Sequence, residues 1–406
     1  MSEEGQRPGL GFGTRALRAA TTPPQVDQKP DSVPIYNAVT YSTESAAELA
    51  DVLGDTKPGY AYSRIDNPTA TALSTTLAEI EGAESAYVFA SGMAAIHATF
   101  VALLKQGDHV VAARQIYGSV QHLLDKILPR FGIETTFVDA TDLDAVAAAF
   151  RPSTRLLHVE TIANPTIVVS DLAALIELGH SRGTTVSVDN TFASPWLCRP
   201  AELGADLVIE ALTKWIGGHS DVLAGGVSGR ADLIAAIRRV QIDTGGTIAP
   251  MSAFLVLRGI ETLHVRMERH SANALALARH LEGAGLNTVS YPGLPSHPQF
   301  AVAQRQLRVG GGMMAFELAD RATAERFLDA LALPPRTASL GSVRTIAVHP
   351  PSSTHRQLDS AELAAIGIPD GLVRVSVGLE EIDDLIADFD QALAAAQARA
   401  AAGIGT

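Results

Sequence analysis

Thiols, long apolar runs and positive charge are all scarce in this sequence of 406 residues. The single cysteine, Cys198, cannot form an internal disulfide or a thiolate metal site by itself. No stretch of about 20 uninterrupted apolar residues occurs, so a membrane-spanning helix is not expected. The formal net charge of −13 argues against a general nucleic-acid binder, because such proteins bind phosphates through many cationic side chains. The composition therefore favours a globular protein of a reducing compartment, most simply an enzyme.

Signatures of metal and dinucleotide sites are also missing. No H-E-x-x-H sequence or cysteine cluster occurs, and the spacing of His264 and His270 does not suit a metal-binding helix face. The glycines of GLGFG at Gly9 neither follow a strand nor open a helix, which disfavours a nicotinamide-dependent oxidoreductase. The first residues, MSEEGQRPGLGFGTR, lack the apolar core of a secretory signal. We therefore expect no metal ion and a cytoplasmic location.

The pattern along the chain predicts three regions. Residues 1–63 are rich in Pro, Thr, Ser and Tyr without helical periodicity, which indicates an arm that contacts a neighbouring subunit or a disordered terminus. Residues 64–260 alternate apolar strands with helices, a pattern typical of a mostly parallel sheet covered on both faces. Residues 261–406 are expected to form a smaller α+β domain, and one long helix over 258–282 spans its beginning.

The elements of the larger region are predicted from short apolar runs and from the turn residues between them. Helices are expected over 68–82 and 93–104. The expected strands are 85–90, 109–113, 155–160, 184–189 and 206–211. This alternation predicts an α/β fold whose strands run mostly in one direction.

Residues capable of chemistry follow the predicted strands at their carboxyl ends, where open parallel sheets bind ligands. Asp189 ends one strand, Lys214 follows the next, and Ser91-Gly92-Met93 joins a third strand to a helix. A carboxylate and an amine on successive strands commonly form a structural ion pair, and many strand-to-helix turns bind nothing. Together with an aromatic residue, however, these three features match the needs of pyridoxal phosphate. They offer a lysine for the Schiff base, a carboxylate for the ring nitrogen and backbone N–H groups for the phosphate.

Longer segments resemble the Cys/Met-metabolism family of pyridoxal-phosphate enzymes, which includes methionine γ-lyases, cystathionine γ-lyases and γ-synthases, and O-acylhomoserine sulfhydrylases. The matching segments run in order along nearly the whole chain: FGTRALR at Phe12, YSRIDNPT at Tyr62, FASGMAA at Phe89, IYGS at Ile116, ETIANPT at Glu160, VDNTFASP at Val188, LTKWIGGHSD at Leu212, RGIETLHVRM at Arg258, HPPSSTH at His349 and LVRVSVGLEEIDDL at Leu372. The resemblance implies fold type I of the pyridoxal-phosphate transferases, the aspartate aminotransferase-like α/β fold. It also implies a homotetramer of two dimers, with active sites at the dimer interface.

The resemblance implies catalytic roles for a few residues. Lys214 would bind pyridoxal phosphate covalently and later remove the Cα proton of the substrate. Asp189 would keep the pyridine nitrogen protonated. Tyr117 would stack on the ring and give a proton to the leaving group, with Arg64 as the source of a lowered tyrosine pKa.

Binding roles follow from the same matching positions. The residues implied in phosphate binding are Gly92, Met93 and Thr213, together with Tyr62 and Arg64 of the neighbouring subunit. Asn164 would lie beside the ring hydroxyl. Ser339 and Arg374 would hold the substrate α-carboxylate, which a bidentate arginine both binds and orients.

The sequence departs from the family pattern at four places. Ala211 replaces a serine that usually contacts the phosphate, which removes a hydrogen bond worth about 1 kcal/mol. Ser119 stands where methionine γ-lyases commonly have cysteine, and Gln241-Ile242 stands where they often have Lys-Asp. Arg344 occupies a position where cystathionine enzymes typically have glutamate, which argues against cystathionine as the preferred ligand. None of these changes touches Lys214 or Asp189, so the chemistry should persist while the specificity changes.

The sequence thus predicts a pyridoxal-phosphate enzyme that acts on a sulfur amino acid or an activated homoserine, without nucleic-acid or membrane partners. We place a carbon–sulfur γ-lyase of methionine γ-lyase type first. An O-acylhomoserine sulfhydrylase or cystathionine γ-synthase, which replace rather than eliminate the γ-substituent, is the alternative, as is a cystathionine γ-lyase. A non-catalytic protein that kept the fold is disfavoured by the intact Lys214, Asp189, Tyr117 and Arg374.

Overall fold

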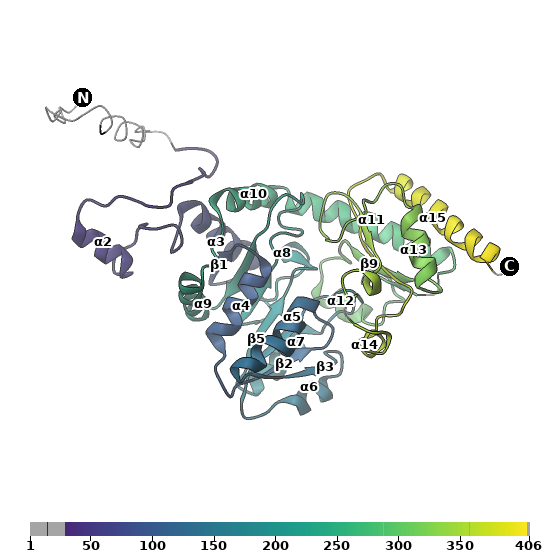
Figure 1. Ribbon diagram of the computed structural model, residues 1–406, viewed down its shortest axis with the longest axis horizontal. Helices are drawn as coiled ribbons and strands as arrows, with labels where there is room; N and C mark the ends of the chain where they lie inside the picture. Colours follow the sequence, from purple (N-terminus) through teal and green to yellow (C-terminus); the bar gives the residue numbers. More distant parts are fainter. Residues whose placement is uncertain (1–13, 15–28, 287, 357, 404–406) are drawn as a thin grey trace. The chain divides into compact units, whose positions relative to one another are not determined.

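The computed structural model describes residue 14 and residues 29–286, 288–356 and 358–403. Residues 1–34 and 35–406 are two separate units, and the second contains both sheets (Figure 1). In the first unit, the described residues 29–34 form no helix or strand. Except for Thr14, the segment FGTRALR at Phe12 lies outside the described residues.

The larger sheet has seven strands in the order β1-β7-β6-β5-β4-β2-β3. Its strands are β1 (Ser85–Phe89), β2 (His109–Ala113), β3 (Glu134–Val138), β4 (Thr154–Glu160), β5 (Thr185–Asp189), β6 (Leu207–Glu210) and β7 (Gly225–Gly229). Strands β2 to β6 pair in parallel, whereas β7 runs antiparallel to both β1 and β6. The mostly parallel sheet is confirmed, and the carboxyl ends of β4, β5 and β6 meet at one edge.

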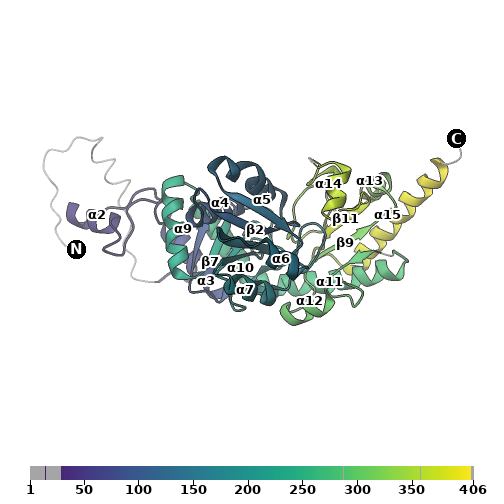
Figure 2. The same ribbon diagram turned by 90° about the horizontal axis from the view of Figure 1, so that it is seen from below.

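Helices cover both faces of this sheet, as expected for parallel strands joined by crossover helices. They are α3 (Pro68–Glu81), α4 (Gly92–Leu103), α5 (Gly118–His122), α6 (Leu143–Ala149), α7 (Leu172–Ser181), α8 (Ser194–Leu197), α9 (Ala231–Thr244) and α10 (Pro250–Glu261), with the π-helix η1 (Leu123–Ile127) and the 3-10 helix η2 (Leu128–Phe131) after α5. Figure 2 shows α4, α5 and α9 on one face and α3, α7 and α10 on the other.

Helix α3 shows how local sequence sets these elements. Its N-cap Asn67 accepts a hydrogen bond from the backbone N–H of Thr69, and Pro68 occupies the first turn, where no N–H is needed. Gly82 ends the helix in the left-handed conformation that glycine adopts without strain. The helix predicted over 68–82 agrees with these bounds.

The smaller sheet has four antiparallel strands in the order β10-β11-β9-β8. They are β8 (Val289–Ser290), β9 (Met313–Glu317), β10 (Ile346–Val348) and β11 (Leu372–Ser376). Its accompanying helices are α11 (Leu263–Gly283), α12 (Phe300–Gln306), α13 (Arg321–Ala330), α14 (Ser360–Ala365) and α15 (Ile382–Gly403), with the 3-10 helix η3 (Pro350–Ser352). The expected smaller α+β part is therefore present.

The buried apolar side chains form two groups; the first contains the large sheet together with Met313 and Ala315 of β9, and the second lies on the small sheet. The second contains a cluster of three rings, Phe316, Phe327 and Phe389, with centroids 5.5 to 6.4 Å apart. Helix α11 contributes to both groups, with Leu263 in the first and Leu277 in the second. The division of the chain near residue 260 stays a prediction, because one helix packs into both cores.

The long helix expected over 258–282 is wrong in one respect: it is two helices, α10 and α11, separated at Thr262. The buried side chain of Arg266 donates hydrogen bonds to the carbonyl oxygens of Gly259 at 2.6 Å and Trp215 at 2.6 Å, and to the hydroxyl of Thr262 at 3.1 Å. The bond to Gly259 uses a carbonyl oxygen that a continuous helix would bond within itself. The bond to Trp215 connects the break between the two helices with the segment after Lys214.

Strand β7 is absent from the sequence prediction because its sequence, GGVSG, has none of the usual strand character except one valine. Its glycines are required by close packing against the neighbouring backbone. A Cβ atom on Gly225 would lie 2.2 Å from the carbonyl oxygen of Ser91 and 2.6 Å from the nitrogen of Gly92. Only glycine allows β7 to pass directly beneath the turn that begins α4.

The part of the predicted arm that belongs to the second unit, residues 35–63, contains α2 (Ala46–Leu53), which has no buried residue. Figure 1 shows α2 standing away from the helices around the sheet. Apolar side chains are exposed along this segment, among them Val39 at 61 % and Leu53 at 50 %. Among the described residues, no helix is both long and apolar enough to cross a membrane.

Candidate active site

A cavity of about 300 Å³ lies at the carboxyl ends of β4, β5 and β6. Most of the predicted site residues line it, namely Gly92, Met93, Tyr117, Asn164, Asp189, Thr213, Lys214, Ser339 and Arg374. Tyr62 and Arg64 are the two that do not. The fold thus brings together residues from the large sheet, from the loop before β10 and from β11 of the small sheet.

Lys214 lies in the turn after β6 and extends its amine into the cavity. The Nζ atom donates a hydrogen bond to the hydroxyl oxygen of Ser339 at 3.0 Å. Burial, with a smaller contribution from the nearby guanidinium of Arg374, lowers the pKa of Lys214 to about 8. A larger fraction of this amine is therefore neutral near pH 7 than for an ordinary lysine, as a nucleophile or base requires.

Asp189 is the last residue of β5 and is almost fully buried. Its carboxylate accepts the backbone N–H of Thr191 at 3.0 Å, and no ion pair to it occurs within the described ranges. Burial raises the pKa of Asp189, while the bonds from Thr191 act in the opposite direction. A buried carboxylate without a cation is costly, and a protonated ring nitrogen would offset that cost.

The turn Ser91-Gly92-Met93 forms the first turn of α4 at one end of the cavity. The Ser91 side chain caps the helix by accepting the N–H of Ala94 at 3.1 Å. A Cβ atom on Gly92 would lie 2.9 Å from the Cβ of Ala211, so the small residue at 211 packs directly against this turn. The N-terminus of a twelve-residue helix, with its unpaired N–H groups, is a suitable site for a phosphate.

Thr213 lies beside this turn and also lines the cavity. Its hydroxyl donates to the carbonyl oxygen of Ala224 at 3.1 Å and accepts the N–H of the same residue at 3.0 Å. These bonds hold the segment between Lys214 and β7 next to the start of α4.

Arg374 reaches the cavity from the middle of β11 and is 3 % exposed. Its guanidinium donates to the side-chain oxygen of Asn164 and to the backbone oxygen of Ser339, both at 2.8 Å. The buried Nε atom has no hydrogen-bond partner among the residues that the structure describes. Asn164 and Ser339 therefore orient the guanidinium, and each of its two NH₂ groups keeps a second N–H for a ligand such as a carboxylate.

Tyr117 stands at the mouth of the cavity with 43 % of its surface exposed. Its backbone N–H donates to Oε1 of Glu160 at 2.7 Å. Glu160, at the end of β4, is a cavity residue that the sequence interpretation did not select. The sequence did contain a signal for it, because Glu160 is an acidic residue at the end of a buried strand that neighbours the strand of Asp189.

Tyr62 and Arg64 lie together near the C-terminal end of α9 and outside this cavity. The Arg64 guanidinium donates to the backbone oxygen of Ile242 and lies 5.5 Å from the centre of the Tyr62 ring. Within one chain they contact neither Tyr117 nor Lys214, so their predicted role in a neighbouring subunit stays a prediction.

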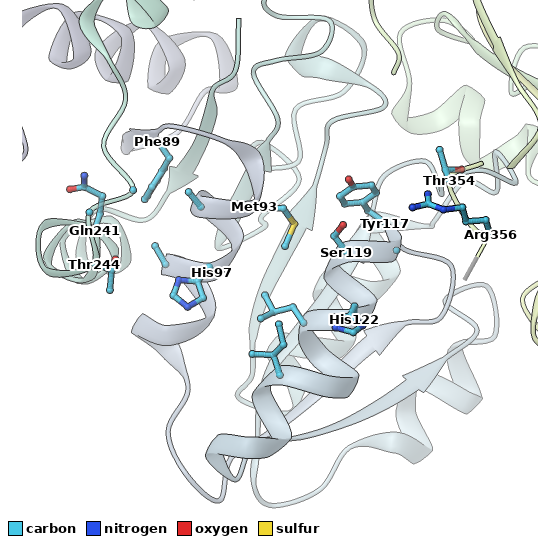
Figure 3. Close-up of a pocket in the computed structure, with 17 residues that line it drawn as sticks. Phe89, Met93, His97, Tyr117, Ser119, His122, Gln241, Thr244, Thr354 and Arg356 are labelled. Carbon is cyan, nitrogen blue, oxygen red and sulfur yellow. The ribbon is translucent and has the colours of Figure 1, made fainter. Parts of the chain in front are cut away.

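A second, larger cavity of about 880 Å³ adjoins the first and shares Met93, Tyr117 and Thr354 with it. Figure 3 shows Gln241 and Thr244 on one side of it and Tyr117, Ser119 and Arg356 on the other. Two departures from the family pattern, Ser119 and Gln241, therefore lie on this surface. Arg344 is exposed and lines neither cavity.

The residues of the smaller cavity fit pyridoxal phosphate by their chemistry. They offer an amine of lowered pKa, a buried carboxylate for a ring nitrogen and a helix N-terminus for a phosphate. The guanidinium of Arg374 lines the same cavity. Within the described ranges, no group of three or more His, Cys, Asp or Glu side chains is arranged to hold a metal ion.

Comparison with known proteins agrees with this chemistry. Residues 13–394 match the family described as "Cys/Met metabolism PLP-dependent enzyme". An L-methionine gamma-lyase from Pseudomonas putida is 42% identical over 95% of this chain and 98% of its own. A cystathionine gamma-synthase from Mycobacterium bovis is 41% identical over 97% of this chain and 100% of its own.

A solved structure shows the same fold with a cofactor. It is a Campylobacter jejuni protein assigned as an O-acetylhomoserine (thiol)-lyase, which carries N'-pyridoxyl-lysine-5'-monophosphate. Its TM-score to this chain is 0.87, with 32% sequence identity over 89% of this chain and 95% of that protein. The relatives thus share the cofactor chemistry but differ in the reaction that they catalyse.

Proposed function

Because the chain belongs to the Cys/Met metabolism family of PLP-dependent enzymes, we propose that it is a carbon–sulfur γ-lyase of methionine γ-lyase type. The reaction takes L-methionine and water to methanethiol, 2-oxobutanoate and ammonia, with no net oxidation. The observation that carries the proposal is the single cavity in which Lys214, Asp189, Tyr117 and Arg374 converge. This set can hold an amino acid, move its protons and protonate a leaving sulfur.

Pyridoxal phosphate supplies, when bound, an electron sink for the negative charge that develops on the substrate carbons. Lys214 would hold it covalently, Asp189 would face its ring nitrogen, and Asn164 would lie beside its ring hydroxyl. The first turn of α4 at Gly92 and Met93, with Thr213 beside it, would bind its phosphate.

Arg374 binds and orients the substrate carboxylate, with Ser339 beside it. The guanidinium is already fixed by Asn164 and by the Ser339 backbone, so little orientational freedom is lost on binding. The Lys214 amine, 3.0 Å from the Ser339 hydroxyl, is placed to accept the Cα proton of an amino acid held there. Tyr117, at the mouth of the cavity, donates a proton to the departing sulfur.

We extend the proposal to the assembly. The arm exposes Val39, Leu53 and Tyr62, and the cavity of about 880 Å³ beside Tyr117 is open. A homotetramer of two dimers, in which Tyr62 and Arg64 of the partner subunit reach the phosphate, would cover both surfaces. In that arrangement each active site is complete only in the dimer.

The second candidate is a γ-replacement enzyme, an O-acylhomoserine sulfhydrylase or a cystathionine γ-synthase. The cystathionine gamma-synthase relative, at 41% identity over 97% of this chain, supports it. Lyase and synthase need the same residues until the γ-substituent has left. They differ only in whether a thiol then adds at Cγ.

Product analysis of the purified holoenzyme distinguishes these candidates. With L-methionine and no sulfide, we expect 2-oxobutanoate and methanethiol in equal amounts, because elimination needs no acceptor. The comparison reactions contain O-acetylhomoserine or O-succinylhomoserine, with and without sulfide or cysteine. Turnover that occurs only with an acylated homoserine plus a thiol, and yields homocysteine or cystathionine, would replace the lyase proposal by the synthase.

A further inference from the structure

The carboxyl group of Glu160 bonds to two segments of the candidate active site at once. Oε1 accepts the backbone N–H of Tyr117 at 2.7 Å, and Oε2 accepts the backbone N–H of Asn164 at 3.2 Å. Glu160 is 5 % exposed, so these bonds are shielded from water. The two N–H groups come from segments more than forty positions apart in the sequence, the loop before α5 and the loop after β4.

The backbone of Glu160 is held in place by the sheet, independently of its side chain. Glu160 pairs in register with Asp189 on β5, and the N–H of the next residue, Thr161, donates to the Asp189 backbone oxygen at 3.0 Å. Burial, and then the charge of Asp189, raises the pKa of Glu160 well above its usual range, whereas the two N–H bonds lower it. Burial of a carboxyl group costs free energy that an apolar residue at the same position would not cost. We therefore expect the two hydrogen bonds of Glu160 to serve a function.

The bonds of Glu160 continue across the cavity to the small sheet. Asn164 accepts a hydrogen bond from Arg374, and Arg374 donates to the backbone of Ser339. The hydroxyl of Ser339 accepts from Lys214. One series of hydrogen bonds thus runs from Tyr117 through Glu160, Asn164, Arg374 and Ser339 to Lys214.

We infer that Glu160 is a positioning residue, which sets Tyr117 and, through Asn164, the carboxylate-binding Arg374 in their working places. It acts through these neighbours and does not itself touch the substrate. The inference rests on the proposed site but not on the choice between elimination and replacement, because both reactions use Tyr117 and Arg374.

The choice of test variants follows from the two hydrogen bonds that Glu160 accepts. In Glu160→Gln, one oxygen becomes an NH₂ group that faces an N–H donor, so one of the two bonds is lost whichever way the amide turns. In Glu160→Asp, the carboxyl group stays but the side chain is one methylene shorter and cannot span both donors. The matched control is Asp388→Asn, since Asp388 is a buried carboxylate that accepts the N–H groups of Ala332 and Leu333 away from the cavity.

Binding of L-norvaline to the holoenzyme is the first readout. Norvaline has the carboxylate that Arg374 binds but no leaving group at Cγ, so the measurement is independent of lyase or synthase activity. We expect Glu160→Gln to weaken norvaline binding about 10- to 100-fold, as for a lost hydrogen bond to a charged group. The affinity of the apoprotein for pyridoxal phosphate, and the visible circular dichroism of the holoenzyme, should also fall, because Tyr117 is displaced.

A double-mutant cycle with Asn164→Ala tests whether Glu160 acts through Asn164. In the Asn164→Ala background, Glu160→Gln should weaken norvaline binding less than in the wild-type background, because the tether to Arg374 is already gone. Asp388→Asn should change thermal stability without changing norvaline binding or the circular dichroism. If Glu160→Gln yields no folded protein, Glu160→Asp provides the same measurements.

The results that overturn the inference are equally specific. Norvaline affinity and circular dichroism that match wild type in folded Glu160→Gln or Glu160→Asp would show that Glu160 is only structural. Equal effects of Glu160→Gln in both backgrounds would show that it does not act through Asn164. A failure of the proposed reaction would instead appear as missing product in the wild-type enzyme, while norvaline binding remained intact.

Discussion

Replacing Lys214 by alanine should abolish covalent attachment of pyridoxal phosphate and lower kcat/KM by at least about 1000-fold. The loss is expected because Lys214 is the amine that faces Ser339 and Arg374 in the cavity and has a pKa of about 8. It is assigned both the attachment of the cofactor and the transfer of the Cα proton. The measurement is the visible absorbance of the purified variant, followed by steady-state kinetics.

Lys105→Ala is the matched control for this variant. Lys105 is an exposed lysine in the loop after α4 and does not line the cavity. We expect its absorbance and kinetics to equal those of the wild-type enzyme. A Lys214→Ala protein that kept the wild-type absorbance band, or lost less than about tenfold in kcat/KM, would contradict the assignment of Lys214.

The second large effect is expected for Asp189→Asn. The variant should still attach pyridoxal phosphate through Lys214, but kcat should fall on the order of 100- to 1000-fold, as when a preorganised charge partner of a reacting group is removed. An asparagine has nearly the shape of Asp189 but carries no charge to keep a ring nitrogen protonated. Reconstitution with N-methylated pyridoxal phosphate, whose nitrogen is charged without a proton, should restore part of the activity.

Asp206→Asn controls for the loss of a buried aspartate. Asp206 stands before β6, at the opposite edge of the sheet, and accepts the N–H of Val186 at 2.8 Å. Its replacement should lower thermal stability and leave kcat unchanged. Equal kcat losses in the two variants would show that Asp189 acts through the fold, and full activity of Asp189→Asn would remove it from the mechanism.

Much of the large sheet could be predicted because its strands carry strong local signals. The run His109–Ala113 is fully buried and apolar apart from His109, and it forms β2 with the predicted bounds. Asn67, Pro68 and Gly82 delimit α3 by their capping chemistry. The positions of Asp189 and Lys214 at the ends of neighbouring strands then follow from the parallel pairing.

The parts that were missed depend on contacts between distant segments. Strand β7 is recognisable only once Ser91 and Gly92 lie against Gly225, because its own sequence has little strand propensity. The break at Thr262 arises from Arg266, whose hydrogen bonds reach residues of the segment after Lys214. No local pattern in the sequence expresses either contact.

The active site, like the fold, could be predicted from the sequence only in part. Resemblance named the residues that line the cavity, yet it passed over Glu160 although the segment ETIANPT begins with it. Its role depends on two backbone N–H groups, and backbone donors leave no trace in residue identity. Tyr62 and Arg64 lie outside the cavity of their own chain, so their assignment depends on a neighbouring subunit.

Borohydride reduction of the wild-type holoenzyme, followed by digestion and mass spectrometry, tests most directly the claim that Lys214 forms the centre of the active site. Reduction fixes pyridoxal phosphate on the lysine that holds it, and the chain has only five lysines: Lys29, Lys57, Lys105, Lys126 and Lys214. The pyridoxyl mass should appear on the peptide that contains Lys214 and on no other. Its appearance on any other lysine, or its absence from all of them, would contradict the account.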